Sequence, residues 1–177
     1  MPGALVLLLG VAAVPAGAQG RAPSHRGLYL ALGPAWGSSQ IRSNSRGSAR
    51  ESGLAGNLRL GAALTRQFTL CLELEGWTRG EDPSGHSSLA GVDAAALVYP
   101  LRTRPAFFKV GIGYANFTVA GTSRDTSADG TGGAAGLGYD VPVGAGLCLT
   151  PGAEIALGGF DGFSSNTIAA TLTLTRH

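Results

Sequence analysis

Residues 68–78 read FTLCLELEGWT, a stretch in which apolar and polar side chains largely alternate. The even-numbered residues from Phe68 to Leu74 are all large and apolar, whereas the odd-numbered positions include Glu73 and Glu75. Because successive side chains of a β-strand point to opposite faces, this period of two predicts a strand with one apolar and one polar face. Its length matches the roughly 9–11 residues with which a tilted strand crosses a membrane.

The same alternation continues through most of the chain. We predict eight strands, at residues 27–37, 53–64, 68–79, 89–99, 106–118, 132–143, 147–158 and 166–176. Short turns at 65–67, 100–105 and 144–146 alternate with longer connections, rich in Ser, Gly, Asp and Arg, at 38–52, 80–88, 119–131 and 159–165. This order predicts an all-β fold: an eight-stranded antiparallel up-and-down transmembrane barrel with both termini on the short-turn side.

The composition excludes several classes of protein. Hydrophobic residues make up 44 % of the chain and charged residues only 14 %, which argues against disorder. The net charge is +2 and no cluster of Lys and Arg is present, so we expect no nucleic-acid partner. A soluble barrel needs a solvent face studded with Lys and Glu, and this chain lacks one. A soluble barrel that carries a lipophilic ligand, with its apolar face inside, stays an alternative because periodicity alone does not fix which face is inside.

The N-terminal residues predict a secretory signal. Residues 4–14 read ALVLLLGVAAV, and Ala16 and Ala18 follow with the small-residue spacing of a cleavage site. The apolar run is shorter than the roughly 20 residues that a spanning helix needs. We therefore expect a signal peptide at 1–18, a short tail at 19–25 and the barrel at 26–177.

All twelve aromatic residues fall towards the ends of the predicted strands. Membrane barrels carry two girdles of aromatic side chains at the two interfaces. We assign one girdle to the termini side: Tyr29, Phe68, Tyr99, Phe107, Phe108 and Tyr139. The other girdle is assigned to the side of the longer connections: Trp36, Trp77, Tyr114, Phe117, Phe160 and Phe163.

Three segments carry a resemblance: PAFFKVGIGYAN at 105–116, GLGYDVP at 136–142 and LTPGAE at 149–154. They resemble the repeating segments of bacterial outer-membrane β-barrels, and the chain is similar to the eight-stranded families of the OmpA membrane domain and OmpX. The resemblance implies a location in the bacterial outer membrane, short periplasmic turns and exposed outer loops. The chain departs from these families at its end, because His177 stands where such barrels commonly carry an aromatic residue.

The polar faces of the strands predict the lining of the lumen. The predicted lumen residues are Asn57, Arg59, Glu73, Glu75, Asp93, Lys109, Asp140 and Glu154. Pairing Leu64 with Phe68 across the first short turn sets Arg59 opposite Glu73, so we predict an ion pair between them. Because the bore of eight strands is only wide enough for side chains, this pair is expected to plug it. A narrow, cation-preferring pore for small solutes, lined by carboxylates, is the alternative.

The first long connection carries three arginines spaced by four residues, Arg42, Arg46 and Arg50. Guanidinium groups form charge-assisted hydrogen bonds with phosphate, so lipopolysaccharide is a candidate partner beside the other outer-membrane lipids. A solvated loop without a ligand is the alternative. We expect the protein to be a monomer with a structural or surface-interaction role.

The chain shows no set of residues for catalysis, a cofactor or a metal ion. His25, His86 and His177 are far apart in the sequence. His86 and Ser88 share one face of their strand, which raises the alternative of a lipid-modifying enzyme, but Asp93 faces the opposite way. We therefore expect a protein that is not an enzyme.

The two cysteines, Cys71 and Cys148, lie on strands that are nearly opposite in an eight-stranded barrel. A disulfide requires Cα atoms within about 7 Å of each other. We expect both thiols to be unpaired and to face the lumen.

Overall fold

The computed structural model describes residues 27–43, 46–47, 50–82, 85–101, 105–120, 126–144 and 146–177. The predicted signal peptide and N-terminal tail lie outside the described residues. No helix in this part of the chain is long and apolar enough to cross a membrane.

The described residues form ten strands, of which eight are long. In chain order they are β1 (Gly27–Ser43), β2 (Arg46–Gly47), β3 (Glu51–Ala63), β4 (Phe68–Asp82), β5 (Gly85–Val98), β6 (Ala106–Ala120), β7 (Thr126–Tyr139), β8 (Val141–Gly144), β9 (Leu147–Phe160) and β10 (Phe163–Arg176).

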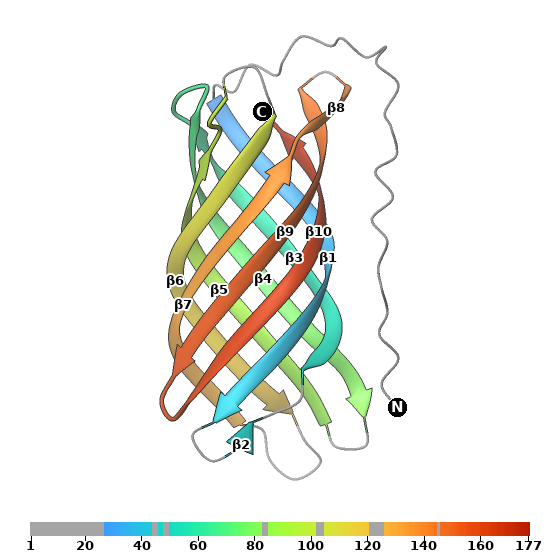
Figure 1. Cartoon of the computed structure of the whole chain (residues 1–177), viewed down its shortest axis with the longest axis vertical. Helices are drawn as coiled ribbons and strands as arrows, with labels where there is room; N and C mark the ends of the chain where they lie inside the picture. The colour runs from blue at the N-terminus through green and yellow to red at the C-terminus, as the bar shows by residue number, and fades with distance from the viewer. Residues whose placement is uncertain are drawn as a thin grey trace.

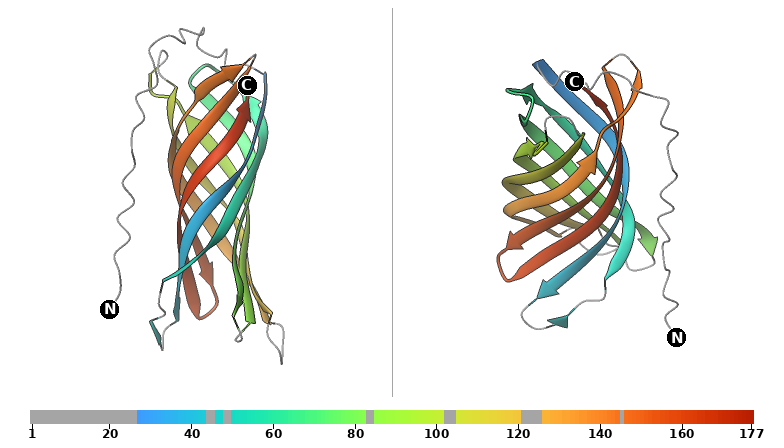
Figure 2. Two further views of the ribbon diagram at one scale, coloured as in Figure 1. Left: turned by 90° about the vertical axis from the view of Figure 1, so that its right-hand side faces the viewer. Right: turned by 45° about the horizontal axis from the view of Figure 1, so that its top comes forward.

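The eight long strands close into an antiparallel barrel (Figures 1 and 2). Each long strand pairs with the next along the chain, and the last, β10, pairs with the first, β1, through a register that begins at Leu30 opposite Arg176. The two short strands sit at the rims, where β2 pairs with the end of β1 and β8 pairs with the start of β9. The predicted fold class, an eight-stranded up-and-down barrel, is confirmed.

The register between β3 and β4 is the one that the sequence predicts. Arg59 lies opposite Glu73, and Ala63 lies opposite Thr69. The turn after β3 fixes this register, because the backbone N–H groups of Leu64 and Thr65 donate to the Phe68 carbonyl oxygen at 3.0 and 3.2 Å. A one-residue slip would turn every side chain of the strand to the other face.

The strands on the side of the longer connections extend further than predicted. β1 continues to Ser43, β4 and β5 enclose only residues 83–84, and β7 begins at Thr126. Between β9 and β10 only Asp161 and Gly162 remain as a turn, and Gly162 has a φ of 81°. The structure therefore contradicts the predicted lengths of four loops, which are shorter than expected: 38–52, 80–88, 119–131 and 159–165. Their Ser- and Gly-rich composition is typical of loops, but the residues of these ranges that lie in the described strands pair with a neighbouring strand.

The predicted strand 132–143 is interrupted at Asp140. β7 ends at Tyr139, and β8 resumes at Val141 and pairs with β9 around a register shift near Pro142. Proline has no N–H to donate to a ladder, which explains why the pairing is irregular there.

The apolar face of the strands points outward. Leu72 is 62 % exposed, whereas its chain neighbour Glu73 is fully buried. The same holds on β10, where Leu172 and Leu174 are exposed and Thr173 and Thr175 are buried. This is the reverse of the arrangement that a soluble, ligand-carrying barrel requires, because the outer wall offers lipid an apolar surface.

The aromatic girdles are only partly as predicted. Trp36, Phe108, Tyr114 and Tyr139 are exposed on the outer wall. By contrast, the side chains of four residues assigned to the girdles are buried: Tyr29, Trp77, Tyr99 and Phe107. The prediction was wrong for these four because it used their distance from the strand ends and not the phase of the alternation.

Three of the four buried rings fill the termini end of the bore. Tyr29, Tyr99 and Phe107 belong to one apolar cluster, in which the Tyr99 and Phe107 rings are 5.3 Å apart. Phe107 fits because Gly138 faces it, and a Cβ atom on Gly138 would overlap the Phe107 ring. The termini end of the lumen is thus packed with aromatic side chains.

Candidate functional site

Four charged side chains from four different strands meet inside the barrel. Arg59 on β3 and Lys109 on β6 alternate with Glu73 on β4 and Glu154 on β9. The Arg59 Nε donates to Glu73 Oε1 at 2.8 Å, and Lys109 Nζ donates to Glu73 Oε2 at 2.7 Å and to Glu154 Oε2 at 2.9 Å. Arg59 Nη2 also donates to Glu154 Oε1. We call these four residues the charge ring.

The charge ring is a neutral arrangement in which every cation touches both anions. Arg59, Glu73 and Lys109 are at most 1 % exposed, and the Glu154 side chain is 12 % exposed. Removing charges from water costs several kcal/mol per ion, and it is offset only when partners and hydrogen bonds surround each ion. The ring supplies those partners, because charge-assisted hydrogen bonds link all four residues.

The Arg59–Glu73 ion pair predicted from the strand register is present. The sequence does not predict that Lys109 and Glu154 join this ion pair. These residues lie on β6 and β9, which do not pair with β3 or β4, so their approach depends on the width and shear of the closed barrel.

Three further predicted lumen residues lie beside the ring without joining it. Asn57 is the register partner of Glu75, and Asp93 is the register partner of Glu73. Both carboxylate oxygens of Asp93 and the Oδ1 atom of Asn57 are buried without a hydrogen-bond partner among the described residues. With all carboxyl groups ionised, Glu75 and Asp93 leave this part of the lumen with a surplus of two negative charges.

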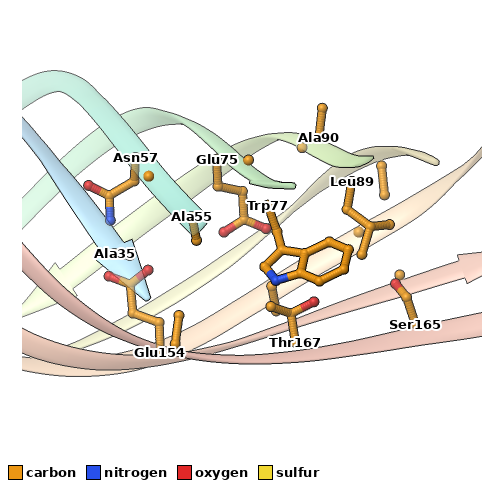
Figure 3. Close-up of a pocket in the computed structure, with 18 of the residues that line it drawn as sticks. Ala35, Ala55, Asn57, Glu75, Trp77, Leu89, Ala90, Glu154, Ser165 and Thr167 are labelled. Carbon is orange, nitrogen blue, oxygen red and sulfur yellow. The ribbon is translucent and has the colours of Figure 1, made fainter. Parts of the chain in front are cut away.

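A cavity lies next to the ring (Figure 3). Its volume is about 60 Å³, which is room for a few water molecules. Glu75, Asn57, Glu154 and the indole of Trp77 line it, and Gly and Ala residues of the surrounding strands make up much of the remaining wall. The Trp77 Nε1–H group donates to the Gly37 carbonyl oxygen at 3.4 Å.

Asp140 belongs to a separate cluster at the termini end. Its carboxylate accepts hydrogen bonds from the Tyr99 hydroxyl at 2.9 Å and from the Thr150 hydroxyl at 2.6 Å. The His177 Nε2 atom lies 3.0 Å from Asp140 Oδ2, and the His177 ring is 5.5 Å from that of Tyr29. The C-terminal residue is thus drawn into the bore.

Sequence reasoning missed the role of His177. The phase of the alternation on β10 carried the signal, because His177 follows Thr173 and Thr175 on the inward face. The phase sets His177 apart from lipid-facing Leu172 and Leu174, but it does not identify Asp140 as the partner, because that contact joins distant parts of the chain.

The predicted basic outer loop is largely part of the barrel wall. Arg42 lies in β1 and Arg50 directly precedes β3, and both are exposed. The Arg50 guanidinium donates to the Ser38 carbonyl oxygen at 2.9 Å and to Asn166 Oδ1 at 3.4 Å. Arg46 lies in β2, opposite Ser43, and its side chain is outside the described part of the structure.

A surface groove lies beside these arginines. Polar Gln40, Arg42 and Asn166 line it together with apolar Ile112 and Leu157. The Arg42 Nη2 atom donates to Gln40 Oε1 at 3.3 Å.

The remaining candidates for chemistry are not assembled into a site. His86 Nε2 lies 2.9 Å from Thr78 Oγ1, while Asp93 faces Glu73 in the register. Cys71 and Cys148 are buried and are both free thiols. Three carboxylate groups that are apart in the sequence do come together in a way that could hold a metal ion. Oxygens of Glu73, Glu75 and Glu154 lie within 4.8 Å of one another.

The comparisons with known proteins agree with this geometry. No family model matches the sequence, and no curated protein matches it. The structure is similar to that of Neisserial surface protein A, with a TM-score of 0.62, 14 % identity, and 85 % of this chain and 96 % of that chain covered. The chain has the fold of the eight-stranded outer-membrane β-barrels.

Two further solved barrels support the assignment. Ail of Yersinia pestis, solved in complex with the heparin analogue sucrose octasulfate, gives a TM-score of 0.59 at 13 % identity, with 84 % and 99 % of the two chains covered. The outer membrane protein OprG of Pseudomonas aeruginosa gives a TM-score of 0.50 at 10 % identity. The match covers 88 % of this chain and 99 % of OprG. The location of these barrels agrees with the outer membrane predicted from the sequence, and the apolar outer wall makes the chain a membrane β-barrel.

We predict that removing one residue of the charge ring strongly lowers the stability of the barrel. Arg59→Met leaves Glu73 and Glu154 with Lys109 alone, so we expect the free energy of unfolding to fall by about 3–5 kcal/mol. Arg79→Met is the matched control, because Arg79 and Glu51 form an ion pair of 2.6 Å with side chains 35 % and 37 % exposed. Such a pair contributes about 0–1 kcal/mol. Urea unfolding in lipid vesicles measures both values, and equal losses in the two variants would contradict the role of the ring.

Proposed function

We propose that the protein is an integral outer-membrane barrel whose own side chains close its lumen, with a structural or cell-surface role and no catalytic activity. The charge ring carries this proposal. Four residues from four strands are linked across the bore by hydrogen bonds of 2.7–2.9 Å and by the Arg59–Glu154 contact. Water and solutes would have to break these contacts in order to pass.

The packing at the termini end supports the same proposal. Tyr29, Tyr99 and Phe107 are at most 4 % exposed, and Asp140 and His177 are linked beside them. An eight-stranded barrel has an interior that side chains fill, which agrees with two successive barriers along one bore. A narrow solute pore remains the competing function, because the carboxylates outnumber the cations beside the ring.

Conductance in planar lipid bilayers distinguishes a closed barrel from a pore. We expect the refolded protein to give no stable current steps. Replacing the ring residues with serine (Arg59→Ser, Glu73→Ser, Lys109→Ser and Glu154→Ser) removes one barrier, and we expect brief openings if the variant keeps the folded mobility on a gel. Stable, reproducible steps from the unaltered protein would reject the closed lumen in favour of the pore.

We further propose that the outer wall around Arg42 and Arg50 contacts lipopolysaccharide phosphates. The Arg50 guanidinium is held against the wall by Ser38 and Asn166, so less of its freedom is lost on binding. The groove beside Arg42 joins polar side chains to Ile112, which is 74 % exposed. A phosphorylated glycolipid carries charge at its headgroup and has acyl chains below it. Its charged and apolar parts therefore match the polar side chains and Ile112 of the groove.

Binding of lipopolysaccharide in detergent tests this second proposal. We expect the double variant Arg42→Ser/Arg50→Ser to bind more weakly and the affinity of the unaltered protein to fall as salt is raised. The control is Arg66→Ser/Arg176→Ser, which removes two exposed arginines from the termini end. Affinity independent of salt, or equal loss in both double variants, would reject a specific contact.

A further inference from the structure

We infer that the cavity beside the charge ring binds one hard divalent cation of the Ca²⁺ class, through Glu75 together with Glu154 and Asn57. We call this cavity the lumen chamber. The inference is independent of whether the lumen conducts, because it concerns a bound ion and not a passage.

The charges of the lumen supply the first argument. The ring is neutral by itself, and neither Glu75 nor Asp93 forms a hydrogen bond or ion pair with a described residue. An ionised carboxylate inside a protein is costly unless it is paired or coordinates a metal. A single divalent cation would cancel the surplus of two negative charges.

The spacing of the carboxylates supplies the second argument. Oxygens of Glu73, Glu75 and Glu154 lie within 4.8 Å of one another. Calcium binds oxygen at about 2.3–2.6 Å, so two ligands on opposite sides of one ion are about 4.6–5.2 Å apart. Glu75 is the one of the three that has no cation from the ring as a direct partner, which makes it the principal ligand.

The side chain of Asn57 is a second, independent observation that points to a bound ligand. This side chain is 6 % exposed, lines the lumen chamber, and has its Oδ1 atom buried without a hydrogen-bond partner. Figure 3 places Asn57, Glu75 and Glu154 around the same end of the chamber, with the amide nitrogen of Asn57 on the side of Glu154 and its oxygen turned away. Rotation of the terminal amide brings its oxygen to an ion held between them, and amide oxygens are ordinary ligands of calcium.

The walls of the chamber leave room for the rest of a coordination shell. Calcium takes six to eight oxygen ligands, and water fills the positions that the protein leaves open. Small residues such as Ala35 and Ala55 keep about 60 Å³ free. Gly91 lets Glu75 lie across β5, because a Cβ atom at residue 91 would be 3.1 Å from Glu75 Cγ and 3.2 Å from its Oε1.

Trp77 gives the site a direct spectroscopic readout. It lines the lumen chamber and is 4 % exposed, whereas Trp36, the other tryptophan, is exposed on the outer wall. Tb³⁺ is a luminescent substitute for Ca²⁺ that a nearby excited indole sensitises. We expect the refolded protein in detergent at neutral pH to give saturable Tb³⁺ luminescence that Ca²⁺ displaces.

The variants separate the chamber from other sites. Glu75→Gln is expected to weaken Ca²⁺ binding by roughly tenfold to a hundredfold, measured by calorimetry. Glu51→Gln is the matched control, because Glu51 pairs with Arg79 and is not among the residues that line the chamber. Trp77→Phe is expected to abolish the luminescence and keep the calorimetric binding, whereas Trp36→Phe is expected to keep both.

Two results would overturn the inference. One is the absence of saturable binding by protein that shows the folded mobility on a gel. The other is equal Ca²⁺ affinity of Glu75→Gln and the unaltered protein, which would place the ion elsewhere. Because folding is checked on the same samples, either result is distinguishable from a failure of the barrel itself.

Discussion

The pairing of β10 with β1 is the contact on which the rest of the structure depends. A sheet in lipid has no water to satisfy its edge strands, so only a closed barrel leaves no backbone N–H or C=O group unpaired. Closure through Leu30–Arg176 to Ser43–Phe163 removes both edges at once. It also divides every strand into an outer and an inner face and sets the width of the bore.

The bore width explains the contents of the lumen. Eight strands leave space for side chains and little else. At the termini end, aromatic rings and the Asp140–His177 contact occupy that space, and further along the bore it is occupied by the charge ring. Beyond the ring, small residues such as Gly, Ala, Ser and Thr make up much of the lining, and the lumen chamber opens there. The position of the chamber is therefore a consequence of side-chain size along the strands.

The sequence predicted those parts of the structure that depend on a single strand or a single hairpin. Leu72 and Glu73 fell on the correct faces because alternation is a local property. Arg59 and Glu73 were paired correctly because one short turn fixes their register. The Lys109 and Glu154 partners were not predicted, because contacts across the bore depend on the closed geometry and not on any pair of neighbouring strands. Trp77 shares the inward phase of Glu73, but it was counted in the outer girdle because its position along the strand was weighed above that phase.

His177 is another residue whose contacts depend on the closed geometry of the barrel. The side chain of His177 joins Asp140, and its backbone N–H donates to the Gly146 carbonyl oxygen at 3.1 Å. The last residue is therefore anchored from inside the bore.

The central claim is that the apolar face of this barrel meets lipid and the polar face meets the lumen. Its most direct test is to refold residues 19–177 with and without detergent and to compare boiled and unboiled samples on a gel. The account predicts folding only in detergent and a shift in mobility between the two samples. Folding in plain buffer with no shift would contradict it, because the apolar residues would then form an interior.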